Sequence, residues 1–169
     1  PNIFVRRDRQ ADRQALLVDP NQPLLNRVIA GTYPSGSTLK PMLAAGALSE
    51  GVITPTTNLD TSAGVITIGQ WQFPDWRVHG LTNVSRAIAE SNDIFFYALA
   101  GGWQQITGLG PAGLEKWLKL FGFGSLTGVD IPGEVTGLVP NEAWKRAQIG
   151  EPWYIGDSYH VGIGQGYFL

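Results

Sequence analysis

Residues 33–41 read Tyr-Pro-Ser-Gly-Ser-Thr-Leu-Lys-Pro, and they mark the point where a loop rich in glycine and proline gives way to an apolar run. Pro41 fits the first turn of a helix, where a missing N–H costs little. The pattern therefore predicts a helix over residues 37–50. Residues three apart on a helix lie on the same face, so we expect the side chains of Ser37 and Lys40 to meet.

Ser37 and Lys40 together have the chemistry of a nucleophile and its base. A serine hydroxyl is a poor nucleophile until a neighbouring base, held within hydrogen-bond reach, takes its proton. The S-x-x-K spacing alone is a weak signal, because serine and lysine are common at solvated helix starts. A phosphate-binding loop is a competing interpretation, but that motif needs lysine directly after its second glycine, where this chain has Ser37. The pattern favours an acyl-transfer serine.

The same nine residues resemble the active-site motif of the penicillin-binding proteins, the serine transpeptidases that cross-link bacterial peptidoglycan. The resemblance to class B members of the elongation type covers nearly the whole chain. It implies an α+β fold of the penicillin-binding and serine β-lactamase type, of which this chain would form a mainly helical portion with short strands and long loops and without most of the central antiparallel sheet. The segments that carry it, besides residues 33–41, are residues 1–5, 23–27, 51–54, 95–97 and 162–166.

Ser91-Asn92-Asp93 stands where the resemblance places the second family motif, S-x-N, on a turn between two helices. The elongation subgroup often ends this motif in aspartate. Ionised aspartate only accepts hydrogen bonds and brings a negative charge, whereas asparagine also donates. From the residues alone, Ser91 and Asp93 are an N-cap pair for a helix that begins at Ile94. The resemblance implies a double role, in which this cap also presents Ser91 to the catalytic centre.

The resemblance implies a covalent mechanism on peptidoglycan stem peptides, with Ser37, Lys40, Ser91 and Asp93 as the catalytic residues. Ser37 attacks the carbonyl of the penultimate D-alanine, the terminal D-alanine leaves, and an amine of a neighbouring stem takes the acyl group. β-Lactam antibiotics imitate the D-alanyl-D-alanine end and remain attached. Ser91 would carry protons toward the leaving amine.

Lys40 has to be neutral if it is the base for Ser37. Its ordinary pKa is about 10.4, and neutrality at pH 7 costs about 4 kcal/mol. Burial and the positive end of the helix both lower the pKa of a lysine, whereas an ionised Asp93 nearby raises it. We therefore expect Asp93 either to lie at a distance from Lys40 or to act through Ser91.

The third family motif, K-T-G or K-S-G on an edge strand, is absent from the sequence. The resemblance implies that this strand follows residue 169, so we expect residues 1–169 to be part of a single transpeptidase domain, truncated at both ends. The strand supplies half of the oxyanion hole, and loss of one oxyanion donor costs roughly 3–4 kcal/mol in the transition state. We expect this chain alone to be nearly inactive.

The composition fits a folded globular piece. The chain has 169 residues, of which 43% are hydrophobic and 15% are charged, which is enough core material for one domain. A net charge of −2 gives no general attraction to nucleic acid. No apolar stretch reaches the ~20 residues needed to cross a bilayer. The resemblance implies a parent protein that is anchored in the bacterial inner membrane, faces the periplasm and works beside a membrane glycosyltransferase and the scaffold of the elongation complex.

Periodicity and turn residues predict the remaining elements. Residues 1–36 read as loop with short helical or extended pieces, and residues 52–80 contain a hairpin around residues 65–68. Further helices are expected over residues 83–90, 93–103, 111–121 and 142–148, with a glycine-rich loop over residues 122–140 and a tight loop lining the substrate cleft over residues 162–166.

Asp60, Asp75 and His79 could in principle bind a metal ion. Some relatives have a comparable set that is completed by a cysteine beside the S-x-D motif, but here that position is Asn92, a poor zinc ligand. Structural zinc sites are almost always four-coordinate. We therefore favour hydrogen-bonding loop residues and expect no metal or other cofactor.

Several functions share the S-x-x-K arrangement and stay open at this point. A serine β-lactamase would hydrolyse the drug, and a β-lactam-sensing domain would hold it. A D,D-carboxypeptidase would use water as the acceptor. A structural or interaction module is the non-enzymatic alternative, and the missing third motif is its best support.

Overall fold

The structure is a computed structural model and describes residues 2–169. The described chain divides into two compact units. The smaller unit contains the described residues up to Thr32 together with Gly128–Val135, and the larger contains Tyr33–Thr127 and Thr136–Leu169. That all 169 residues belong to a single domain stays a prediction. Within the described residues, no helix is both long enough and apolar enough to span a membrane.

The smaller unit is built from short helical pieces, as predicted for the start of the chain. The side chain of Arg13 donates to the carbonyl oxygens of Ile3 and Arg6, at 3.1 and 2.6 Å. The backbone N–H of Val135 donates to the Ile29 carbonyl at 2.9 Å. The first two bonds join α1 to η1 and to the residue before η2, and the third joins α2 to residues 128–135. The described helices of the unit are η1 (Asn2–Phe4), η2 (Arg7–Arg9), α1 (Gln10–Val18) and α2 (Arg27–Ala30).

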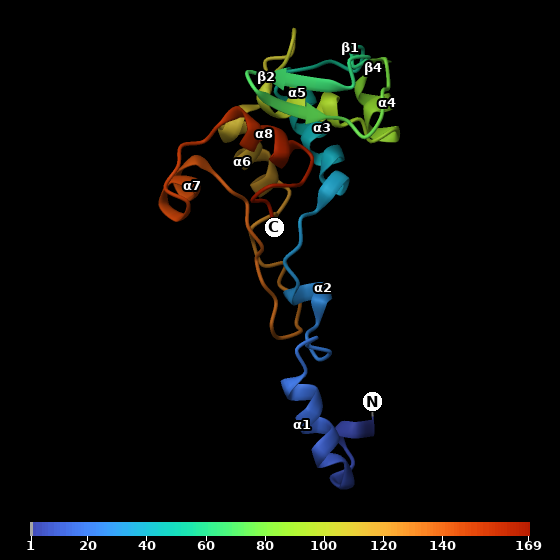
Figure 1. Cartoon of the computed structure of the whole chain (residues 1–169), viewed down its shortest axis with the longest axis vertical. Helices are drawn as coiled ribbons and strands as arrows, with labels where there is room; N and C mark the ends of the chain where they lie inside the picture. Colours follow the sequence, from blue (N-terminus) through green and yellow to red (C-terminus); the bar gives the residue numbers. More distant parts are fainter. Residues whose placement is uncertain (1) are drawn as a thin grey trace. The chain divides into compact units, whose positions relative to one another are not determined.

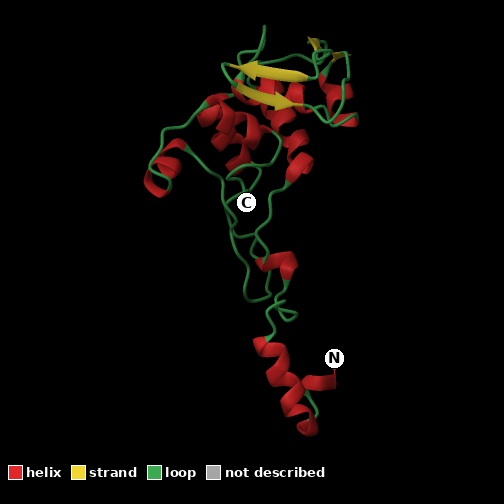
Figure 2. Cartoon of the chain, viewed as in Figure 1, coloured by secondary structure: helices red, strands yellow, loops and turns green. Residues whose placement is uncertain are grey.

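The larger unit is mainly helical with two small antiparallel sheets, which confirms the predicted fold class. Its helices are η3 (Gly36–Leu39), α3 (Lys40–Ser49), α4 (Val84–Ala89), α5 (Asp93–Gly101), α6 (Gly110–Leu120), α7 (Glu142–Gln148) and α8 (Ile155–Gly162). Its strands are β1 (Leu59–Asp60), β2 (Val65–Ile68), β3 (Trp71–Pro74) and β4 (Leu81–Thr82). β1 pairs with β4, and β2 forms the predicted hairpin with β3. Figure 2 shows the strands on one side of the helices.

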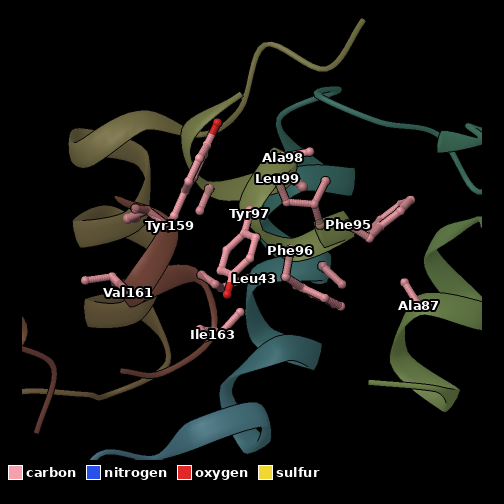
Figure 3. Close-up of a cluster of buried hydrophobic side chains, with 14 of the residues drawn as sticks. Leu43, Ala87, Phe95, Phe96, Tyr97, Ala98, Leu99, Tyr159, Val161 and Ile163 are labelled. Carbon is pink, nitrogen blue, oxygen red and sulfur yellow. The ribbon is translucent and has the colours of Figure 1, made fainter. Parts of the chain in front are cut away.

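Helix α5 is the centre of the core. It is buried from Ile94 through Ala100, as expected for a helix that is apolar on every face. Helices α3, α6 and α8 contact it, and Figure 1 shows this group beneath the β2–β3 hairpin. In Figure 3, Tyr97 of α5 lies beside Tyr159 of α8, with ring centres 5.4 Å apart. This packing fixes where α3 and α5 begin, and the site is built at those two points.

Candidate active site

Ser37 lies in the 3₁₀ turn η3, directly before α3. The predicted helix over residues 37–50 is thus confirmed, with a tighter first turn. In a 3₁₀ helix, side chains three apart eclipse one another, so Ser37 and Lys40 point to the same side. Ser37 is exposed, whereas Lys40 is only 1% exposed. The geometry gives an accessible hydroxyl above a buried amine.

The loop over residues 162–166 holds Gly36, the residue that precedes Ser37. Gly36 has a φ of +58°, and its N–H donates to the Gly164 carbonyl at 2.9 Å. This contact holds the loop next to Ser37. That the loop also lines the substrate cleft stays a prediction. A cavity of 990 Å³ is lined by Phe73, Tyr154 and Gly166, among others, and by none of the four predicted catalytic residues.

The hydroxyl of Ser91 lies between Ser37 and Lys40. Ser91 Oγ donates to Ser37 Oγ at 2.9 Å, and Lys40 Nζ donates to Ser91 Oγ at 3.1 Å. The hydrogen bonds described for Lys40 do not include one to Ser37. The expectation that these two side chains meet directly is therefore corrected, because they are joined through Ser91.

The ammonium group of Lys40 has three acceptors, all from the Ser91–Asp93 turn. They are Ser91 O at 2.8 Å, Ser91 Oγ at 3.1 Å and Asp93 Oδ1 at 2.5 Å. An ammonium group has three N–H bonds, so these contacts use all of them. The expectation that Asp93 lies away from Lys40 or acts through Ser91 is wrong. Lys40 begins α3 and Asp93 begins α5, and the packing of α3 against α5 brings the two side chains into direct contact.

Burial shifts the pKa values of Lys40 and Asp93 toward their neutral forms. It lowers the pKa of Lys40 below the ordinary value of 10.5, against the hydrogen bond and charge of Asp93, which raise it. It raises the pKa of Asp93 above the ordinary value of 3.8, against the hydrogen bond and charge of Lys40. The cost of desolvating both charges thus favours the neutral amine that a base at Lys40 requires.

Asn92 caps α5, so the N-cap pair of Ser91 and Asp93 predicted from the residues alone is not formed. The fully buried Asn92 accepts from the Phe95 N–H at 2.7 Å and donates to Thr61 Oγ1 at 2.9 Å. The sequence interpretation missed this residue, although the preference of asparagine for N-cap positions could have revealed it. Because Asn92 makes the cap, the side chains of Ser91 and Asp93 contact Lys40 instead.

The three residues considered as metal ligands all take part in hydrogen bonds. Asp60 Oδ1 accepts from the Ser62 N–H at 2.9 Å. His79 Nε2 lies 3.3 Å from Asp75 Oδ1. Among the described residues, no three or more His, Cys, Asp or Glu side chains are grouped so that they could hold a metal ion. These contacts match the favoured interpretation as hydrogen-bonding loop residues.

Comparison with known families decides the class to which this site belongs. The chain matches the penicillin binding protein transpeptidase domain over residues 4–167. It belongs to that family. Peptidoglycan D,D-transpeptidase MrdA of Escherichia coli K12 is 43% identical over 99% of this chain and 26% of its own length. MrdA of Haemophilus influenzae is 39% identical over 99% of this chain and 25% of its own length.

Solved structures of relatives share the fold. PBP2 of Helicobacter pylori in complex with MreC superposes with a TM-score of 0.83 at 37% identity, covering 94% of this chain and 29% of that chain. PBP2 of Pseudomonas aeruginosa in complex with WCK 5153 superposes with a TM-score of 0.83 at 35% identity, covering 94% of this chain and 34% of that chain. The resemblance to the PBP2 type is confirmed. The chain spans about a quarter of the length of the curated relatives.

Proposed function

We propose that the protein is a peptidoglycan D,D-transpeptidase of cell-wall elongation and that this chain carries its nucleophile. The observation that carries the proposal is the chain of hydrogen bonds from Ser37 Oγ to Ser91 Oγ at 2.9 Å and on to Lys40 Nζ at 3.1 Å. It links the exposed hydroxyl of Ser37 to the buried amine of Lys40. Burial lowers the pKa of this amine. Relatives named D,D-transpeptidase support the reaction class.

In the acylation step, Ser37 Oγ attacks the carbonyl carbon of the penultimate D-alanine. The hydroxyl of Ser91 rotates, accepts the proton of Ser37 and passes its own proton to neutral Lys40. The C–N bond to the terminal D-alanine then breaks, and the leaving amine takes a proton back along the same path. In the second step, an amine of a neighbouring stem attacks the acyl-enzyme and restores the Ser37 hydroxyl.

Asp93 is a group with which Lys40 can exchange a proton. Its Oδ1 lies 2.5 Å from Lys40 Nζ, so a proton can pass between the two groups without any movement of the chain. Burial raises the pKa of Asp93 and lowers that of Lys40. A protonated Asp93 beside a free amine therefore avoids the cost of two buried charges.

The partners of the protein are proposed from the relatives. The proposed substrate is the peptidoglycan stem peptide, and β-lactam antibiotics are proposed to acylate Ser37. PBP2 of H. pylori was solved with MreC, and another relative was solved in a peptidoglycan synthase complex. We extend this to a scaffold protein and a membrane glycosyltransferase at the periplasmic face of the inner membrane, where a transmembrane anchor would hold the protein.

Labelling with a fluorescent penicillin tests the nucleophile in the full-length protein. Ser37→Ala removes the attacking oxygen, so no covalent label is expected. Ser49→Ala is the matched control, because Ser49 is exposed at the far end of the same helix. It should label at the wild-type rate, and mass spectrometry should place the adduct on the peptide that contains Ser37. A label on Ser37→Ala contradicts the assignment.

Product analysis separates the alternative activities. With two stem peptides as substrates, a transpeptidase makes a cross-linked dimer, whereas a carboxypeptidase releases the shortened stem. Rapid release of hydrolysed penicillin from the acyl-enzyme would instead indicate a β-lactamase. We expect the dimer and slow release of the drug.

A further inference from the structure

The Ser91–Asp93 turn has a backbone conformation that needs support. Ser91 has a φ of +53°, in the left-handed region that non-glycine residues keep only where the surrounding structure holds them. The same residue provides two of the three acceptors of Lys40 and the only described hydrogen bond to Ser37 Oγ. Any contact that holds this turn therefore also holds the proposed proton path.

Asp75 and Trp76, which follow strand β3, both form hydrogen bonds with the backbone of this turn and the start of α5. The side chain of Asp75 has no exposed surface, and its Oδ2 accepts from the Ile94 N–H at 3.0 Å. The indole N–H of Trp76 donates to the Ser91 carbonyl at 3.2 Å. That carbonyl also accepts from Lys40, so both of its lone pairs are used.

Asp75 is itself held by a series of polar contacts that reaches α4. His79, with a fully buried side chain, lies between two carboxylates, with Nε2 3.3 Å from Asp75 Oδ1 and Nδ1 2.8 Å from Glu90 Oε2. Glu90 in turn accepts from Arg86 at 2.9 Å. These contacts run from the end of α4 to the first turn of α5 and so bridge the turn that joins the two helices.

We propose that Asp75 and Trp76 are positioning residues for acylation, which hold Ser91 in the orientation that links Ser37 to Lys40. The inference rests on the proposed function, because it assigns a role in that same reaction. Neither side chain has a described hydrogen bond to Ser37 Oγ, whereas both have one to the backbone of Ser91 or Ile94, so both act through the turn. Loosening the turn should lower the rate constant of acylation and leave the affinity for the drug unchanged.

Trp76→Phe in the full-length protein carries the test. It keeps an aromatic ring at a position that is 61% exposed and removes the indole N–H that donates to Ser91. Stopped-flow labelling with a fluorescent penicillin separates the acylation rate constant from the dissociation constant. Loss of one hydrogen bond predicts an acylation rate constant lower by about threefold to tenfold, with an unchanged dissociation constant and melting temperature. Trp71→Phe is the matched control, because Trp71 lies in the preceding strand β3, is 67% exposed and makes no described hydrogen bond to the turn. This variant should behave as wild type.

Asp75 variants give a second measurement. Asp75→Ala and Asp75→Asn both remove the charge, but asparagine keeps an oxygen that can accept from Ile94. We expect the alanine variant to acylate slowly and the asparagine variant to recover part of the rate. Because Asp75→Ala leaves a buried N–H without a partner and can prevent folding, the comparison is read only where both variants melt cooperatively.

The outcomes distinguish the two proposals. A wild-type acylation rate constant in Trp76→Phe, a loss confined to the dissociation constant, or an equal loss in Trp71→Phe would overturn the positioning role. In each of these cases, the wild-type protein is still labelled at Ser37. Failure of the wild-type protein itself to become labelled at Ser37 would overturn the proposed function.

Discussion

Two opposing effects act on the pKa of Lys40, which are burial and the carboxylate of Asp93. Its side chain is buried, which favours the neutral amine, yet Asp93 lies 2.5 Å away and favours the charged form. Desolvation is the larger of the two effects on the pKa of Lys40. The net effect lowers the pKa of Lys40, which is the direction that the proposed role as a base requires.

Asp93→Asn should move the pH dependence of acylation. The carboxylate raises the pKa of Lys40 through its hydrogen bond and its charge, so its removal lets that pKa fall further. A larger fraction of Lys40 is then neutral at a given pH, and the rising limb of the acylation rate shifts to lower pH. Stopped-flow labelling across a pH series measures the shift, and a limb displaced to higher pH would show that Asp93 acts in another way.

At the scale of elements, the site depends on how α3, α5 and the loop after α8 come together. Gly164 lies so close to the start of η3 that a Cβ atom there would overlap the backbone of Gly36 and the hydroxyl of Ser35. Its φ of +69° is also unfavourable for other residues. The loop therefore controls the position of Gly36, just before Ser37.

Gly164→Ala should lower both stability and acylation. Overlap with backbone atoms and a left-handed φ together predict a loss of about 2–4 kcal/mol in the free energy of unfolding. Gly150→Ala is the control, because Gly150 has a φ of +82° but no atom within 4 Å of an added Cβ, so only the backbone cost of about 1–2 kcal/mol applies. Urea unfolding and penicillin labelling measure the two effects. If the two variants lost the same unfolding free energy and labelled at the same rate, the loop would accommodate the added methyl group without moving Ser37.

Local patterns predicted much of the fold and the site because they depend on neighbouring residues. The start of α3, the β2–β3 hairpin and helices α4 to α7 are all marked by caps, turns or periodicity. Helix α8 is not, since Gly156 and Ser158 are weak helix formers and its stability comes from packing on α5, where Gly162 lies against Ala100. The contacts of Asp75 and Trp76 with the turn likewise arise only when the hairpin meets α5, and no sequence spacing records them.

At the scale of the whole molecule, stability in acid should depend on Glu90. Its hydrogen bonds with Arg86 and then His79 lower its pKa from 4.5 to about 2. The folded state therefore keeps this carboxylate charged at pH values where the unfolded chain binds a proton. This contribution to stability is present above about pH 4.5 and is lost as the pH falls toward about 2.

Glu90→Gln removes that contribution, so wild type and variant should differ most at about pH 5 and converge toward pH 2. Urea unfolding of both proteins across this range gives the difference in unfolding free energy at each pH. A difference that stays constant over the range would mean that the carboxylate charge does not contribute.

The three acceptors around Lys40 also define what this residue does not do. With every N–H of the ammonium already paired to the Ser91–Asp93 turn, none is left to pull electron density from an incoming carbonyl group. This pairing supports the proposed role of Lys40 in proton transfer, and we do not expect its ammonium form to polarise the substrate carbonyl. The polarisation that makes the substrate carbon reactive has to come from other groups, such as backbone N–H donors.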